Sequence, residues 1–429
     1  MLESAEGRGM LYVVTVSVAF LLWFLIKWLI IERQRYPPGP FRLPFLGNVF
    51  QVDQQISGRP QGFLYGIFSK HQKDGDGIIL CQGDKWMAQR RFALKTFHNF
   101  GMGKRVMESK INYHKNLLLK RLSGLCDTDT RIGVVDLHLH IGYCVGNIIN
   151  DLVMGRFYHF GEPEFLKFKK LIDNTLEGFA SASMQLVNMY PFLRFFVPYY
   201  RTYVKEGFEI QEFFLEEIEK HEAVFDPNSE PTNFIDAYLA DIKQGKEKYL
   251  NKLTLALDAG DLWTGGMETT VTTVRWGIMY LIQHPGIQEA LQLELDAVLD
   301  LNQPSTNQRQ DLHYMNAVLD EIQRIVNVLP WGIPHQTLEE VQINGFRIPV
   351  GTTVMPQVGA VHHDEKNFPD PEVFNPERFL DKHGTYKKHP KLSAFGLGKR
   401  SCLGEALARM ELFLIFAGLV QNFSFHPYQ

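Results

Sequence analysis

The chain has little cysteine, and the few residues follow no pairing pattern. Its 429 residues include four cysteines, Cys81, Cys126, Cys144 and Cys402, with no C-x-x-C pair and no zinc spacing. This argues against a disulfide scaffold or a structural zinc site and suits a reducing compartment.

The chain also has no large excess of positive or negative charge. The formal net charge is −4 and no arginine-rich run occurs, so nothing indicates a nucleic-acid partner. Internal repeats and low-complexity stretches are absent.

One long apolar run is present near the start. Residues 10–31 are almost wholly apolar and contain one cation, Lys27, close to the far end. About 20 such residues span a bilayer, so we expect a single-pass transmembrane anchor; an amphipathic core helix is the alternative. Arg33 and Arg35 follow the run, against Arg8 alone before it. The positive-inside rule then places residues 1–9 in the lumen and the body of the chain in the cytosol.

The body is predicted to be mainly helical. Residues 32–40 end in Tyr36-Pro37-Pro38-Gly39-Pro40, which predicts a stiff hinge. Apolar residues then recur at helical spacing, for example in Phe165–Leu176 and Phe208–Ile218, and the longest proline-free segment runs from Leu253 to Gln283. After Pro330, Val341–Ile348 and Thr352–Gln357 look extended. We therefore expect an α+β fold, mainly α with a smaller β part.

The most informative segment lies near the end of the chain. The run Phe395-Gly-Leu-Gly-Lys-Arg-Ser-Cys-Leu-Gly404 places Cys402 directly before the helical pattern that starts at Glu405. A thiolate there is stabilised by the helix dipole and free backbone N–H groups. The glycines allow a tight turn and a close approach to a flat ligand. A buried structural cysteine after a glycine turn is the alternative.

This run resembles, at every defining position, the haem-binding signature of the cytochrome P450 family. The matching residues are Phe395, Gly396, Gly398, Arg400, Cys402 and Gly404. The resemblance implies a P450 fold in residues 41–429, haem b as cofactor, and Cys402 as the axial ligand of the haem iron.

A second motif lies in the longest predicted helix. Gly265-Gly266-Met267-Glu268-Thr269 puts two glycines in mid-helix, where they permit either an opened groove or simple close packing. Together with Cys402 it resembles the family's oxygen-activation motif. By that resemblance Thr269 would hydrogen-bond bound dioxygen, and Glu268 would take part in proton delivery.

Further matches to the family concern the support of the haem. Trp86, Arg90, His335 and Arg400 resemble propionate partners, and guanidinium groups suit carboxylates. A core tryptophan and an ordinary polar histidine are the alternatives for Trp86 and His335. Glu321 and Arg324, three apart on one helix, resemble with Arg378 a network that holds the cysteine loop. A surface salt bridge is the alternative for the first two.

The resemblance also implies partners. Six basic residues lie near the haem motifs and could dock an acidic electron donor: Arg91, Lys95, Lys387, Lys388, Lys391 and Lys399. The family's donor is NADPH–cytochrome P450 reductase, with cytochrome b5 as a second candidate. A solvated surface is the alternative.

Two expected parts of the fold look missing. Few residues separate Pro40 from Trp86, where the family has a helix, a β hairpin and a further helix; Phe63–Lys70 could form the first helix. The family's last hairpin would lie beyond Gln429. We therefore expect a shortened catalytic domain with a compromised pocket.

We expect a microsomal monooxygenase that acts on a lipophilic small molecule such as a xenobiotic, fatty acid or steroid. Its place would be the endoplasmic reticulum membrane, with membrane lipid around the anchor and its electrons coming from NADPH through the reductase. Two hypotheses remain beside it. One is a shortened, non-catalytic haem protein of the same fold. The other is a reductase-independent isomerase, against which the Glu268–Thr269 pair argues because such chemistry needs no delivered protons.

Overall fold

Two units make up the structure, a computed structural model. It describes residues 15–20, 22–23, 27, 77–181, 183–184, 187, 191–300, 302–333 and 335–428. The smaller unit comprises residues 1–60 with 331–356, and the larger unit residues 61–330 with 357–429. The predicted hinge and the helix Phe63–Lys70 lie outside the described residues, as does most of the predicted anchor. Within the described ranges, no helix has both the length and the apolarity needed to cross a membrane.

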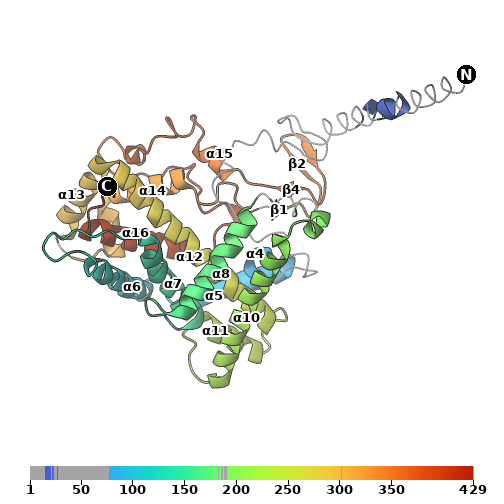
Figure 1. Ribbon diagram of the computed structural model, residues 1–429, viewed down its shortest axis with the longest axis horizontal. Helices are drawn as coiled ribbons and strands as arrows, with labels where there is room; N and C mark the ends of the chain where they lie inside the picture. Colours follow the sequence, from blue (N-terminus) through green and yellow to red (C-terminus); the bar gives the residue numbers. More distant parts are fainter. Residues whose placement is uncertain are drawn as a thin grey trace, which may run out of the picture. The chain divides into compact units, whose positions relative to one another are not determined.

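The larger unit is helical, which confirms the expectation of a mainly α chain. Its longer helices are α5 (Gly83–Asn99), α6 (Arg105–Ser123), α7 (Leu137–Met154), α8 (Pro163–Ala180), α10 (Tyr199–Val224), α11 (Phe234–Lys243), α12 (Lys252–Gln283), α13 (Pro285–Leu299), α14 (His313–Val326) and α16 (Glu405–Asn422). Short helices are α4 (Gly77–Leu80), α15 (Val358–His362), η2 (Pro191–Phe195), η3 (Thr306–Asp311), η4 (Pro376–Phe379) and η5 (Gly398–Arg400). The helices pack around α12, which contacts α4, α7, α10, α14 and α16 (Figure 1).

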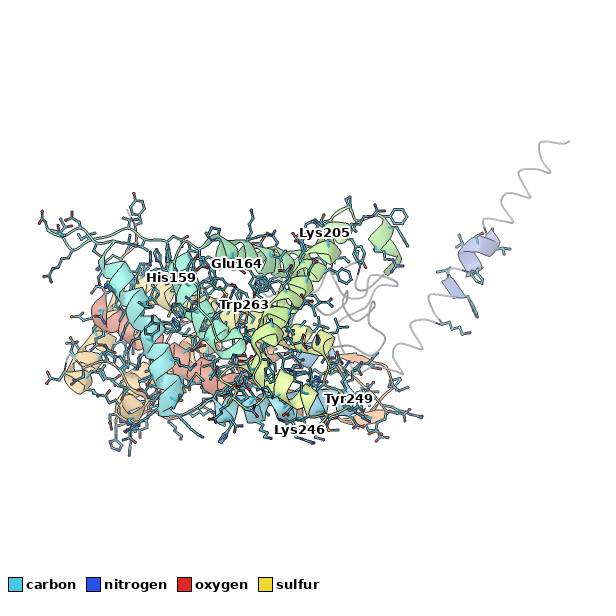
Figure 2. All side chains as sticks on the ribbon, turned by 90° about the horizontal axis from the view of Figure 1, so that it is seen from below. His159, Glu164, Lys205, Lys246, Tyr249 and Trp263 are labelled. Carbon is cyan, nitrogen blue, oxygen red and sulfur yellow. The ribbon has the colours of Figure 1, made fainter. Side chains whose placement is uncertain are left out.

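Helix α12 has clear sequence signals at both ends. The Asn251 side chain accepts the Thr254 backbone N–H at 2.9 Å, and Pro285 follows the last turn. The predicted bounds are therefore correct to within one residue. In its interior lies Trp263, which is labelled in Figure 2 and is fully buried. Its Nε1 donates to Asn150 Oδ1 at 2.6 Å. Because a buried indole needs an acceptor, this bond fixes α12 against α7.

The described strands all belong to the smaller unit, and both segments that were predicted to be extended contain strands. Residues 341–348 form two strands, β2 (Val341–Ile343) and β3 (Phe346–Ile348), paired antiparallel. The turn is Asn344-Gly345, both with positive φ (50° and 82°), as a two-residue hairpin requires. Of the predicted segment 352–357, only β4 (Thr353–Val354) is a strand; it pairs antiparallel with β1 (His335–Gln336).

The core of the larger unit contains an unusual acid. Glu411 on α16 is 1% exposed; its Oε2 accepts the Thr270 hydroxyl at 3.3 Å, and its Oε1 has no partner among the described residues. Burial raises the pKa of Glu411 to about 8. The folded protein therefore keeps a proton here that the unfolded chain releases above its ordinary carboxyl pKa.

We expect Glu411→Gln to stabilise the protein at alkaline pH. A raised folded-state pKa means that stability is lost as pH rises from about 5 to about 8. The neutral amide removes that loss, so the variant should gain on the order of 1–3 kcal/mol at pH 8 and little at pH 5. Urea midpoints at the two pH values measure this. Equal pH dependence in both proteins would contradict it.

Candidate active site

The Cys402 loop is a tight turn that presents a thiol. The Cys402 backbone N–H donates to the Phe395 carbonyl at 2.8 Å, and Gly396 donates to Ser393 at 2.9 Å. Gly396 and Gly398 have φ of +74° and +78°, a conformation that favours glycine. Helix α16 begins three residues after Cys402. The backbone conformation of this turn therefore explains why two positions of the haem-binding signature, Gly396 and Gly398, are glycine.

The groups around Cys402 shift the pKa of its thiol in opposite directions. The side chain is exposed, yet the protein packed beside the sulfur removes much of its hydration. This desolvation is the main cause that raises the pKa of Cys402, and Glu405 adds to it. The Gly404 backbone N–H and the Arg90 guanidinium lower it. The protein therefore offers the thiolate two stabilising groups but needs a further positive charge to hold it at neutral pH.

Two guanidinium groups and one indole lie beside the loop. Arg90 on α5 donates from Nη2 to the Ser401 carbonyl at 2.9 Å. Arg400 donates from Nη2 to the Cys81 carbonyl at 2.7 Å, and its guanidinium lies 3.9 Å from the centre of the Trp86 ring. The structure thus brings Cys402, Trp86, Arg90 and Arg400 together, from segments more than 300 residues apart.

His335 belongs to the smaller unit, where it is the first residue of β1. Its part in propionate binding stays a prediction.

The mid-helix glycines of α12 have different surroundings. A Cβ at Gly266 would lie 3.0 Å from Ile149 Cδ1, so this glycine allows α12 and α7 to approach closely. At Gly265 an added Cβ would meet no atom within 4 Å. The Thr269 hydroxyl donates to the Gly265 carbonyl at 2.7 Å, which places this hydroxyl on the open side.

Glu268 points into a charged cluster on another side of α12. Its Oε1 lies 3.2 Å from Lys169 Nζ on α8. Burial raises the pKa of Glu268, while Lys169 lowers it.

Glu321, Arg324 and Arg378 form one buried network. Arg324 donates from Nε and Nη2 to the two Glu321 carboxylate oxygens at 2.7 and 2.8 Å, and both side chains are fully buried. Arg378 Nε donates to Glu321 Oε1 at 3.2 Å, and the Asn375 backbone N–H donates to the same oxygen at 2.8 Å. Helix α14 is thereby joined to η4.

His362, which the sequence analysis did not single out, connects this network to the cysteine loop. Its carbonyl accepts from Arg324 Nη1 at 2.9 Å, and its Nε2 accepts the Ser393 backbone N–H at 3.0 Å. Ser393 in turn accepts from Gly396. Burial lowers the pKa of His362 to about 4, so it is a neutral acceptor at physiological pH. No local pattern in the sequence marks this histidine, because both bonds are long-range.

The residues present fit a haem. Cys402 is an exposed thiol, although free cysteine is among the most buried residue types. An added Cβ at Gly398 or Gly404 would meet no atom within 4 Å, as at Gly265. Guanidinium groups and an indole N–H are suitable donors for two propionates. The six predicted docking residues are all exposed: Arg91, Lys95, Lys387, Lys388, Lys391 and Lys399.

Comparisons with known proteins agree with this site. The family model Cytochrome P450 matches residues 52–429. A 3-ketosteroid oxygenase of Caenorhabditis elegans is 37% identical over 97% of this chain and 79% of its own length. Cytochrome P450 2J3 of Rattus norvegicus is 32% identical (96% and 89%), as is cytochrome P450 2J2 of Homo sapiens (94% and 89%).

The alignment with the Caenorhabditis protein covers 463 positions, more than the 429 residues of this chain. That relative therefore carries internal residues without a counterpart here. A shortening before Trp86 stays a prediction. The family model matches most of the chain, and the rat and human relatives are themselves named as cytochromes P450. The chain belongs to the cytochrome P450 family of monooxygenases.

Proposed function

We propose that the protein inserts one oxygen atom of dioxygen into a lipophilic small molecule, with electrons from NADPH supplied by a flavoprotein reductase. The observation that supports this best is the meeting of Cys402 with Trp86, Arg90 and Arg400 at one loop. Haem b bound there would supply the redox chemistry that activates dioxygen.

The chain's own groups have distinct tasks in this proposal. Cys402 provides the anionic ligand, and the Gly404 N–H and Arg90 stabilise its charge. Trp86, Arg90 and Arg400 would donate hydrogen bonds to the propionates. Glu321, Arg324 and Arg378 hold the loop through His362.

Thr269 and Glu268 are the residues that hold and transfer protons in this proposal. The Thr269 hydroxyl, tied to the Gly265 carbonyl, is placed to hold a proton on the open side of α12. Burial raises the pKa of Glu268, which favours its protonated form, so Glu268 can pass a proton on and replenish this one.

We expect Thr269→Ala to reduce product per NADPH about 10²-fold, with NADPH consumption retained and hydrogen peroxide formed instead. Without the hydroxyl, protons are no longer placed, so the electrons leave with partly reduced oxygen. Thr269→Ser keeps the hydroxyl and should stay near wild type. The measurement is product, peroxide and NADPH in one reaction. Unchanged product per NADPH in Thr269→Ala would contradict the assignment.

The substrate and partners follow from the relatives and from the charge pattern. Similarity to a 3-ketosteroid oxygenase makes a 3-ketosteroid the first substrate to test. The six exposed basic residues suit an acidic reductase domain or cytochrome b5. Residues 10–31 would anchor the chain in the endoplasmic reticulum membrane, with the catalytic part in the cytosol.

A shortened, non-catalytic haem protein is the second candidate, favoured by the internal residues that the chain lacks relative to its relatives. Haem retention without turnover of any substrate would support it. Turnover without NADPH would instead support an isomerase.

A further inference from the structure

Arg409 on α16 lies against Phe395, the first residue of the haem-binding signature. Its guanidinium carbon is 4.7 Å from the centre of the Phe395 ring. A guanidinium is planar and only weakly hydrated, so it can stack on an aromatic face. The Phe395 carbonyl accepts the Cys402 backbone N–H at 2.8 Å. Phe395 is therefore tied to Cys402 by its backbone and to Arg409 by its side chain.

Two acids fix the direction of the Arg409 guanidinium. Its Nε donates to Glu405 Oε1 at 2.8 Å, one turn earlier on α16, and its Nη1 lies 3.7 Å from Asp320 Oδ1 on α14. The Glu405 side chain is 38% exposed, whereas that of Asp320 is 2% exposed. Since water screens charged groups at the surface, Asp320 is the partner of Arg409 that water screens least.

Asp320 is itself held by two further side chains. Its Oδ2 accepts the Tyr386 hydroxyl, and its Oδ1 accepts Gln323 Nε2 at 3.3 Å. Tyr386 lies on the segment that follows η4, where its backbone pairs with Leu380. The hydroxyl, the amide and the Arg409 guanidinium can all donate, as the partners of an ionised carboxylate must. Asp320 thus joins α14, the segment after η4, and α16.

Asp320 and Glu321 are adjacent on α14 and support the cysteine loop at two different residues. Glu321 belongs to the buried network that reaches the loop at Ser393. Asp320 reaches the loop at Phe395, through Arg409. The contacts of Asp320 therefore hold the end of the loop that the first network does not hold.

We propose that Asp320 is a positioning residue for the thiolate of the haem site. It holds Arg409 against Phe395, and this contact fixes the loop that carries Cys402. The Tyr386 hydroxyl supports Asp320 in this role. The inference rests on the proposed binding of haem at Cys402, but the contacts that carry it are those of the protein alone. It can therefore be tested both with and without a haem signal.

The first test measures hydrogen exchange of the loop amides in the protein as isolated. Asp320→Asn and Arg409→Gln should each speed exchange at the Cys402 amide about tenfold, because its bond to the Phe395 carbonyl opens more often. Tyr386→Phe, a milder change, should act in the same direction. The control is Tyr314→Phe, which removes a hydroxyl from α14 itself and should leave exchange in the loop unchanged.

The double variant decides whether Asp320 acts through Arg409. If it does, Asp320→Asn combined with Arg409→Gln should exchange no faster than either single variant. A roughly hundredfold increase would mean that the two residues act separately, and it would overturn the proposal. Unchanged exchange in both single variants, or faster exchange spread evenly over all helices, would overturn it as well.

The second test follows the thiolate itself, through the lifetime of the thiolate-type carbon monoxide band on mild warming. Asp320→Asn should shorten this lifetime about tenfold, and Tyr314→Phe should keep it at the wild-type value. If loop exchange rises while the lifetime is unchanged, Asp320 does not position the thiolate and the proposal is wrong. If wild type gives no thiolate band, the proposed function fails, and hydrogen exchange still decides whether Asp320 positions the loop.

Discussion

Replacement of Arg324 by alanine is expected to lower the free energy of unfolding by about 3–5 kcal/mol. The substitution removes a fully buried guanidinium that makes two bonds to Glu321 and one to the His362 carbonyl. Glu321 would stay buried, with Arg378 as its remaining cation. Since domains are stable by only about 5–15 kcal/mol, we expect this variant to lose most of its stability.

The size of this effect depends on burial. An exposed pair, Lys205 with Glu209 on α10, is the matched control, with side chains 77% and 41% exposed. Lys205→Ala should cost less than about 1 kcal/mol because water screens such a pair. Denaturant unfolding measures both variants. If Arg324→Ala falls within 1 kcal/mol of the control, the network does not hold the fold as we infer.

Replacement of Cys402 by serine is expected to abolish the thiolate-type absorption of the haem protein and its turnover. Serine has nearly the same shape, but its hydroxyl stays protonated at neutral pH and is a poor ligand. Trp86, Arg90 and Arg400 would remain, so some haem should still bind. The haem content should therefore fall less than the thiolate signal does.

A second cysteine provides the control for this prediction. Cys126 is partly exposed, and its thiol donates to the Leu122 carbonyl at 3.5 Å within a surface helix end. Cys126→Ser should keep the wild-type spectrum. Retention of the thiolate signal in Cys402→Ser would mean that another residue binds the iron.

The sequence predicted the cysteine loop well because its information is local. Gly396, Gly398 and Cys402 lie within seven residues, and the turn needs those residue types in that order. The bounds of α12 were also predictable, from Asn251 as N-cap and Pro285 as terminator. The hairpin at Asn344-Gly345 was missed although its turn signal is present.

Other features could not be predicted because they join distant residues. His362 contacts Arg324 and Ser393, which are 38 and 31 residues away, and no spacing rule selects it. The Lys169–Glu268 contact joins residues 99 apart. A lysine inside an amphipathic helix normally points to solvent, so only packing against α7 and α12 shows that this one does not.

The measurement that tests the central claim most directly is the carbon monoxide difference spectrum of the reduced, membrane-expressed chain. We predict a Soret band at the position of thiolate-ligated haem, which would show that this chain folds with Cys402 on the iron. A band at the position of the inactive form, or no haem at all, would contradict the account.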